Sequence, residues 1–184
     1  SIQFDAGSNS GTRRFEFHLR PISGYIYSNE HYLILSSATS LLPAAITTSS
    51  NSTYAGLQGY LATITSAEED TWSMTIATAA WISGSDAAVE GTWVHTAGPE
   101  LGQALSPTYW DTPPQQPDTP AEDCLIAYAS AGYSGWHDVM CNLTQYYVIE
   151  YGGMAGDPSV PSMKANASTT IDAVGPDVTT VRST

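Results

Sequence analysis

The middle of the chain holds a long stretch without regular structure, and this stretch constrains the fold more than any other feature. Residues 97–121 are rich in Pro, Gly, Gln and Thr and show little hydrophobic periodicity. Loops longer than about 15 residues are uncommon in compact domains, and those that do occur are often functional. We therefore expect a domain that folds around one long irregular loop, with its binding site in that loop.

The segments on both sides of this loop predict strands and helices. Aromatic and β-branched residues predict strands or hairpins at 13–19, 25–35 and 124–129, and again between 132 and 153. A short helix is expected to start near Ser37, with Pro43 in its first turn. A second helix is predicted to begin at Ser66, because Ser66 and Glu69 have the spacing of a capping box.

The charge balance narrows the possible partners. The chain has 18 acidic and 5 basic residues, which gives a formal net charge of −13. Such a surface repels nucleic acid and anionic membranes and attracts cations. No stretch approaches the roughly 20 apolar residues of a membrane span. Charged residues make up only 12% of the chain and Ser, Thr, Ala and Gly are frequent, which favours an extracellular, secreted or cell-surface location.

The segment QPDTPAEDC, residues 116–124, crowds oxygen-bearing side chains together with no Lys or Arg nearby. These side chains are Gln116, Asp118, Glu122 and Asp123. Crowded carboxylates repel one another unless a cation lies among them or the loop is a solvated turn, and at this point both explanations stay open. Cys124 and Cys141 flank the following segment and form either a disulfide or two buried thiols.

Six short motifs follow one another along the chain: GYLATITSAEE, AWISGSDAAVEGTW, QPD, EDC, GWHDVMC and YYVIEYGG. Their order resembles the C-type lectin domain, in the form found in large microbial secreted proteins, over roughly residues 25–153. The resemblance implies an α+β class and a C-type lectin-like fold. Two helices, small antiparallel sheets and a long irregular loop region that carries the ligand site are then expected.

Three segments are expected along the chain. Residues 1–24 form an N-terminal strand or extension, and residues 25–153 form the C-type lectin-like domain. From 154 to 184 large apolar residues become scarce, which indicates a linker or the start of a neighbouring domain. Because the chain begins SIQF without a methionine, we expect a mature or excised piece of a larger multidomain protein or assembly.

The resemblance also implies a set of ligands for Ca²⁺ and sugar. Residues 116–118 form a Gln-Pro-Asp triplet, the form associated with galactose-type sugars, and residues 136–138 stand where the family has a Trp-Asn-Asp turn. The expected metal ligands are Gln116, Asp118, Glu122 and Asp138. The expected sugar-binding residues are Gln116, Asp118, Glu122, Trp136, His137 and Asp138. A cis peptide bond before Pro117 would aim residues 116 and 118 to the same side.

Further positions match other sites of the family. An auxiliary calcium site in some members corresponds to Asp86, Glu90 and Asp123, although Thr119 replaces a further acidic ligand. Cys124 and Cys141 match the inner disulfide of the family. Ile149 stands where the last cysteine of an outer disulfide would be, so that bridge is missing.

His137 departs from the family pattern, since an Asn at this position supplies an oxygen. Nitrogen is a poor ligand for Ca²⁺ and a good one for transition metals. Three outcomes follow: a weakened calcium site, a site retuned to another ion, or no metal at all.

Two functions compete. The first is non-catalytic, calcium-assisted binding of a galactose-type carbohydrate by a secreted or surface adhesin-like protein, with a glycan or an extracellular protein as partner. The alternative is a structural or protein-interaction module that has lost calcium and sugar binding, and an ice-binding variant is a third possibility. No nucleophile–base pair has motif support, so we do not expect an enzyme. Sequons at Asn51, Asn142 and Asn166 would make the protein a glycoprotein if its host glycosylates them.

Overall fold

The computed structural model describes residues 31–130 and 132–157 in full, together with the backbone of five short strands outside these ranges. The chain divides into two units, one formed by Ser1–Ile22 with Pro161–Thr184 and the other by Ser23–Val160. In the first unit β1 (Ile2–Phe4) pairs with β2 (Arg13–Phe15), and β11 (Thr169–Asp172) pairs with β12 (Thr180–Ser183); both pairings are antiparallel. The predicted strand at 13–19 is thus present as β2, and residues 16–19 lie outside the described part.

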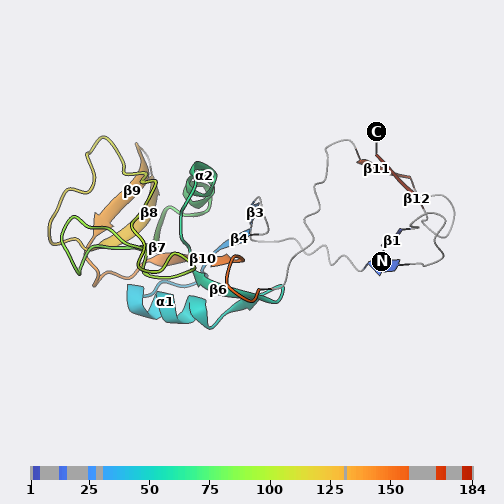
Figure 1. Ribbon diagram of the computed structural model, residues 1–184. Helices are drawn as coiled ribbons and strands as arrows, with labels where there is room; N and C mark the ends of the chain where they lie inside the picture. The colour runs from blue at the N-terminus through green and yellow to red at the C-terminus, as the bar shows by residue number, and fades with distance from the viewer. Residues whose placement is uncertain are drawn as a thin grey trace. The chain divides into compact units, whose positions relative to one another are not determined.

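The second unit is built on a connected eight-stranded sheet (Figure 1). One half contains β3 (Tyr25–Tyr27), β4 (His31–Leu35), β10 (Tyr146–Tyr151), β6 (Leu57–Leu61) and β5 (Thr53–Tyr54). The other half is the antiparallel set β7 (Ala79–Ser85), β8 (Cys124–Ser130) and β9 (Tyr133–Val139). The two expected antiparallel sheets are therefore joined, because Tyr146 and Tyr147 of β10 pair in parallel with Ala80 and Trp81 of β7.

Helix α2 (Ala67–Ile76) begins where the sequence predicts it. The Ser66 hydroxyl accepts a hydrogen bond from the Glu69 backbone N–H at 3.3 Å, and the Glu69 carboxylate accepts one from the Ser66 N–H at 3.0 Å. These two bonds make the capping box and satisfy backbone donors that a free helix end leaves unpaired.

Helix α1 (Leu42–Ser50) starts later than the expected position near Ser37. Ser40 forms a β-bridge with Gln145, which keeps the chain extended up to that point. Pro43 lies in the first helical turn, as predicted, where its missing N–H costs no helical hydrogen bond.

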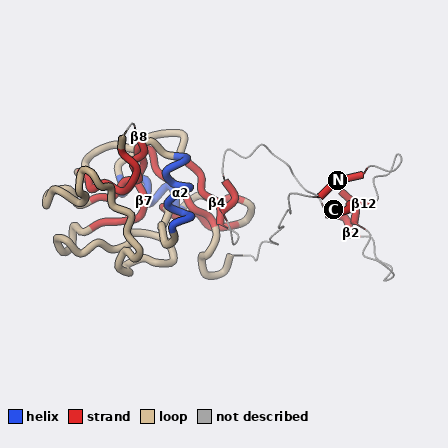
Figure 2. The backbone as a smooth tube through the Cα atoms, turned by 90° about the horizontal axis from the view of Figure 1, so that it is seen from above, coloured by secondary structure: helices blue, strands red, loops and turns tan. Residues whose placement is uncertain are grey.

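Two hydrophobic clusters form the core, and each helix packs on one of them. Alternation along β8 divides the clusters, because Leu125 and Ala127 join the first while Cys124 and Ile126 join the second. Helix α2 packs against the first cluster, beside β7 and β8 (Figure 2), and α1 contributes Leu42 and Ala45 to the second.

The long loop after β7 is fixed onto strand β9. The backbone N–H of Trp136 donates to the Tyr109 carbonyl at 2.8 Å, and that of Asp111 donates to the Trp136 carbonyl at 3.1 Å. The rings of Tyr109 and Trp110 both contact the Trp136 ring edge-on, at centroid distances of 5.4 and 5.9 Å. An irregular segment therefore gains the backbone pairing and aromatic packing of an added strand.

Asp111 is the anchor of this loop. Its buried carboxylate accepts hydrogen bonds from the backbone N–H of Ser134 at 3.1 Å and from His137 Nε2 at 3.0 Å. Its carbonyl accepts the backbone N–H of Gln116 at 3.1 Å. Gly135 lies directly beneath, since a Cβ atom there would come within 2.8 Å of the Asp111 backbone. The position of residues 111–116 on β9 thus depends on the hydrogen bonds of the Asp111 carboxylate and on the absence of a side chain at Gly135.

Substitution of this glycine tests the docking. We expect Gly135→Ala to destabilise the fold by about 1–3 kcal/mol, the usual cost of forcing atoms into a well-packed site. Urea denaturation followed by tryptophan fluorescence measures the loss. Ser134→Ala is the matched control, because the Ser134 side chain is exposed and only its backbone bonds to Asp111. Equal stability of Gly135→Ala and wild type would contradict the close approach.

A second prediction concerns pH and Asp70, in the first turn of α2. Asp70 accepts the indole N–H of Trp136 at 2.9 Å. Burial raises the pKa of Asp70 from 3.8 to about 6, and the hydrogen bond from Trp136 partly opposes the shift. Because the folded state holds this proton more tightly than the unfolded state, stability is lost as the pH rises from about 4 to about 6.

Asp70→Asn removes this titration while an amide oxygen still accepts the indole N–H. We expect the stability difference between Asp70→Asn and wild type to grow in favour of the variant between pH 4 and pH 6, measured by urea denaturation at each pH. Glu68→Gln controls for lost charge at the same helix end, since Glu68 is exposed. Parallel pH profiles for Asp70→Asn and wild type would show that Asp70 does not titrate in this range.

Candidate functional site

Three carboxylates converge at the end of the long loop. Asp118 and Glu122 belong to the loop and Asp138 belongs to β9, and one oxygen of each lies within 4.8 Å of the others. Asp138 is buried, Glu122 is partly buried and Asp118 is exposed, so the group opens to solvent on one side. The sequence prediction had placed these residues in one ligand set, and the fold brings them together.

Backbone hydrogen bonds hold this carboxylate cluster, which we define as Asp118, Glu122 and Asp138. The Asp138 carboxylate accepts the N–H groups of Asp118 at 3.2 Å and of Thr119 at 3.1 Å. In return, the Asp138 N–H donates to Gln116 Oε1 at 3.3 Å. The peptide bond between Gln116 and Pro117 is cis. The Gln116 side chain therefore joins the long loop to β9 next to the cluster.

The electrostatics of the cluster favour a cation. Burial raises the pKa of Glu122 first, and the charges of Asp138 and Asp118 raise it further. Residues 21–163 contain no Lys or Arg, because the five basic residues lie at positions 13, 14, 20, 164 and 182. Carboxylate oxygens are the ligands that Ca²⁺ and Mg²⁺ prefer. The donor set is thus compatible with a hard divalent ion.

The expected auxiliary set is less compact. Asp86 follows β7 and is 4% exposed, and its Oδ2 accepts the Gly91 N–H at 2.9 Å. Its buried Oδ1 has no hydrogen-bond partner among the described residues. The Asp86 N–H donates to the Asp123 carbonyl at 3.3 Å, which ties the two positions together. Partial desolvation and then the charges of Asp86, Asp123 and Asp138 raise the pKa of the exposed Glu90. Asp86, Glu90 and Asp123 do not meet as closely as the carboxylate cluster.

Two expected sugar ligands lie elsewhere, and strand geometry is the reason. Residues 136–138 are part of β9 and do not form a turn, so alternate side chains point to opposite faces. Trp136 is 0% exposed and donates its indole N–H to Asp70, so its ring cannot contact a ligand. His137 points away from Asp138, bonds to Asp111, and packs on Tyr128 at a centroid distance of 4.8 Å. The role of Trp136 as a sugar ligand stays a prediction, and the fold encloses its ring.

A second group of titratable side chains was not predicted. His31, Glu69 and Glu150 bring ligand atoms within 4.8 Å of one another. His31 Nδ1 donates to Glu150 Oε1 at 2.6 Å, and the Thr63 N–H donates to Glu150 Oε2 at 3.0 Å. The hydrogen bond to Glu150 raises the pKa of His31, and burial raises that of Glu150. The signal in the sequence was a glutamate inside the apolar strand YYVIEY.

The cysteine pair is resolved. Cys124 at the start of β8 and Cys141 after β9 form a disulfide, with their Cα atoms 5.1 Å apart. The disulfide cross-links the two ends of the β8–β9 hairpin. Glu122 lies two residues before Cys124 and Asp138 three residues before Cys141, so the bridge restrains both.

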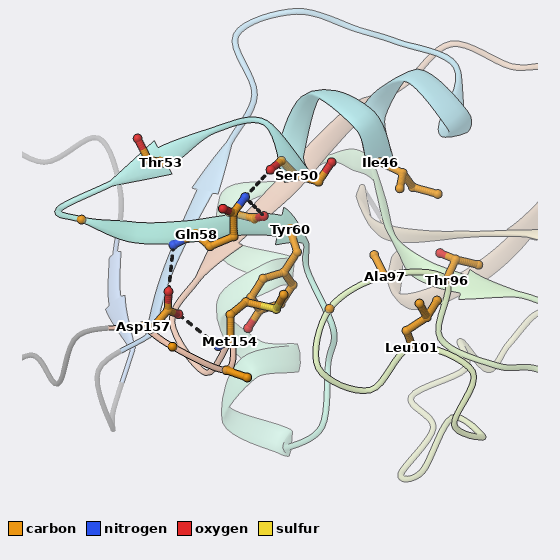
Figure 3. A pocket seen from close by; sticks show the side chains of 15 residues that line it. Ile46, Ser50, Thr53, Gln58, Tyr60, Thr96, Ala97, Leu101, Met154 and Asp157 are labelled. Atoms are coloured by element: carbon orange, nitrogen blue, oxygen red, sulfur yellow. Dashed lines mark hydrogen bonds between the residues drawn. The ribbon is translucent and has the colours of Figure 1, made fainter.

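A pocket of about 680 Å³ lies between α1, the β5–β6 hairpin and the turn at 154–157 (Figure 3). No residue of the carboxylate cluster lines it. Several of its polar groups are already bonded to one another or to the backbone. Asp157 accepts the N–H groups of Gln58 and Met154 at 3.0 Å each, and the Gln58 side-chain amide donates to the Ser50 carbonyl. This pocket therefore offers mainly apolar surface.

Comparison with known proteins identifies the fold. A family model described as "Lectin C-type domain" matches residues 48–150. Halomucin of Haloquadratum walsbyi is 30% identical over 166 residues, which is 82% of this chain and 2% of that protein. The chain thus spans a very small part of this relative.

Solved structures agree on the architecture. The mouse scavenger receptor C-type lectin carbohydrate-recognition domain has a TM-score of 0.58 at 19% identity, covering 74% of this chain and 98% of that chain. The C-type lectin CEL-I of Cucumaria echinata has a TM-score of 0.57 at 19% identity and covers 73% and 98%. A calcium-independent type II antifreeze protein has a TM-score of 0.56 at 22% identity and covers 72% and 93%. At these identities the likeness shows the fold.

The α+β class and the C-type lectin-like fold are thereby confirmed. Neither helix among the described residues is long and apolar enough for a bilayer span. The family consists of binding domains, generally for carbohydrate, and the domain is not an enzyme. The chain belongs to the C-type lectin domain family.

Proposed function

We propose that this domain is a calcium-assisted, galactose-type carbohydrate-binding module of a secreted or surface adhesin-like protein. The observation that carries the proposal is the convergence of Asp118, Glu122 and Asp138 in a domain whose body has no Lys or Arg. No side-chain ammonium or guanidinium is available there to neutralise these carboxylates, so a divalent ion is the natural counter-charge.

The residues that would hold Ca²⁺ are those of the carboxylate cluster, with Gln116 as a neutral fourth oxygen donor. Ca²⁺ takes six to eight oxygen ligands, so backbone carbonyls, water and sugar hydroxyls would complete the shell. When bound, the ion supplies a Lewis-acidic centre to which a vicinal diol can bind. Asp118 and Glu122 are the more exposed members and would accept hydrogen bonds from the same hydroxyls.

The sugar class rests on the Gln116–Asp118 triplet, which is of the galactose type by family resemblance. Relatives support binding of carbohydrate in general, since one is a carbohydrate-recognition domain. Asp86, with its unpaired buried Oδ1, would hold an auxiliary ion together with Asp123 and Glu90. Such an ion would stabilise the segment between β7 and the loop.

The proposed setting is extracellular and adhesive. Asn51 and Asn142 are exposed, so their sequons are accessible for glycosylation, and Asn166 lies outside the described residues. A disulfide suits an oxidising compartment. We assign the lectin domain to residues 25–153 and treat 1–24 and 154–184 as connections to other parts of a larger protein. The partner would be a glycan or a glycosylated extracellular protein.

A second candidate is a structural or protein-interaction module without calcium. One observation favours it: both oxygens of Asp138 already accept backbone N–H groups, and Gln116 Oε1 is also engaged. The loop is therefore held without an ion, and one structural neighbour is described as calcium-independent. Because that neighbour is an antifreeze protein, ice binding would be one form of this second candidate.

Calcium titration separates the two candidates. If Ca²⁺ binds only the folded state, a concentration of 100 times Kd stabilises the fold by about 2.7 kcal/mol and raises Tm. We expect this rise for wild type. Asp118→Asn should lower calcium affinity at least tenfold, while the exposed Glu68→Gln should leave it unchanged. A wild-type Tm that ignores both Ca²⁺ and chelator would support the calcium-free module.

Calorimetry with galactose tests the ligand itself. We expect heat of binding in the presence of Ca²⁺ and none after addition of chelator, because the ion bridges the sugar to the carboxylate cluster. Asp118→Asn should remove the heat, since Asp118 would contact both the ion and the sugar. Equal heats with and without chelator would rule out a metal-dependent sugar site.

A further inference from the structure

The pair formed by His31 and Glu150 joins two strands of the sheet and has no part in the proposed function. His31 lies at the start of β4, and Glu150 lies in β10, which pairs antiparallel with β4. His31 Nδ1 donates to Glu150 Oε1 at 2.6 Å. The side chain of Glu150 is 2% exposed and that of His31 is 26% exposed. A buried carboxylate is thus bonded to an imidazole that solvent can reach.

The surroundings of Glu150 make this imidazole its natural counter-charge. Glu69 at the start of α2 brings a carboxylate oxygen within 4.8 Å of the ligand atoms of both His31 and Glu150. A third carboxylate, that of Glu100, accepts the Thr63 hydroxyl at 2.8 Å, and the Thr63 N–H donates to Glu150 Oε2. Three acids from three elements therefore surround one histidine, and residues 21–163 contain no Lys or Arg.

Tyr60 of β6 is the remaining titratable group that the structure describes around the pair. Its hydroxyl donates to the Gly152 carbonyl at 2.7 Å. Burial first, and then the charge of Glu150, raise the pKa of Tyr60, so its phenol stays neutral. Among the described side chains around Glu150, His31 is thus the group that can carry a positive charge.

The imidazole also contacts the chain as it leaves β10. A Cβ atom at Gly153 would come within 2.9 Å of His31 Cε1. His31 therefore holds together the first residue of β4, the buried carboxylate of β10 and the segment that follows β10. Loss of its interaction with Glu150 would act first on the pairing of these two strands.

We propose that His31 and Glu150 form a pH-dependent switch, in which one shared proton keeps β4 closed on β10 and removal of that proton at alkaline pH opens this strand pair. Without the proton, Glu150 is a buried carboxylate that has lost its counter-charge and faces Glu69, a situation that is costly. The switch is separate from the carboxylate cluster, since neither residue belongs to it, and it needs no ligand.

The direction of the pH effect follows from the pair. The hydrogen bond to Glu150 raises the pKa of His31 above 6.5, although burial opposes the shift, and burial raises the pKa of Glu150. Below pH 6.5 both the closed and the open state hold the proton of His31. As the pH rises from 6.5 to the raised pKa, the open state loses the proton while the closed state keeps it. Opening then becomes more favourable by up to about tenfold per pH unit.

Hydrogen exchange of the full chain measures this opening at the backbone amides of β4 and β10. The informative quantity is the ratio of exchange rates in wild type and Glu150→Gln, because base catalysis and the titration of Asp70 affect both proteins alike. Glu150→Gln keeps an oxygen for the Thr63 N–H and removes the buried charge. We expect this ratio to rise about tenfold or more between pH 6.5 and pH 8.5. The same ratio for amides of β8 and β9 should stay constant.

Glu68→Gln is the matched control, since it removes an exposed carboxylate near the same helix end. Its rates should follow those of wild type at every pH. A ratio for β4 and β10 that does not change with pH would refute the switch. An equal rise at β8 and β9 would also refute it, because the whole domain would then unfold.

NMR titration of the imidazoles gives a second test that needs no variant to fold. His31 should titrate above pH 6.5 in wild type, and it should titrate at a lower pH in Glu150→Gln. His95 is an internal control, because burial lowers its pKa and its Nδ1 lies 3.2 Å from the Ser83 carbonyl. It should titrate below pH 6.5 in both proteins. Titration of wild-type His31 at or below pH 6.5 would overturn the proposal.

Discussion

The buried carboxylates of this domain must be stabilised without Lys or Arg, because residues 21–163 contain neither. The rest of the structure depends on how this is done. Removing a carboxylate from water is costly unless hydrogen-bond donors or opposite charges replace the lost hydration. Here the donors include backbone N–H groups together with histidine, tryptophan and threonine side chains. Glu69 caps α2, Glu150 accepts from His31 and Thr63, and Asp111 accepts from Ser134 and His137. Each of these acids accepts at least one backbone N–H, and residues 21–163 offer it no Lys or Arg to bond instead.

In the carboxylate cluster, backbone donors satisfy only part of the carboxylate oxygens. Asp138 is satisfied by backbone donors, but Glu122 and Asp118 retain oxygens directed to solvent within reach of one another. Burial first, and then the charges of Asp138 and Asp118, raise the pKa of Glu122. The net charge of −13 means that the rest of the surface increases the local attraction for cations. Folding thus brings three of the carboxylates together between the loop and β9.

Sequence reasoning located much of this correctly because the relevant signals are local or follow motif order. The capping box at Ser66 and Glu69 is local, and so are the strands β8 and β10. Motif order brought Gln116, Asp118, Glu122 and Asp138 into one set before any coordinates. The start of α1 was missed because a bridge between Ser40 and Gln145, distant in sequence, extends the chain there. The turn expected at residues 136–138 is a strand, which turns the side chains of His137 and Asp138 to opposite faces. Asp111 gave no motif signal, since its role arises only when the loop docks.

The hydrogen bonds that hold the loop exist independently of any ion, and this has an evolutionary consequence. Asp111 and Asp138 attach residues 111–119 to β9 through backbone N–H groups and the His137 imidazole. A lineage could therefore lose Asp118 or Glu122 and keep a folded domain, or regain them later without rebuilding the scaffold. The residues that choose the ligand and the residues that stabilise the fold can then change independently in evolution. One fold can therefore give rise to both metal-dependent and metal-free descendants.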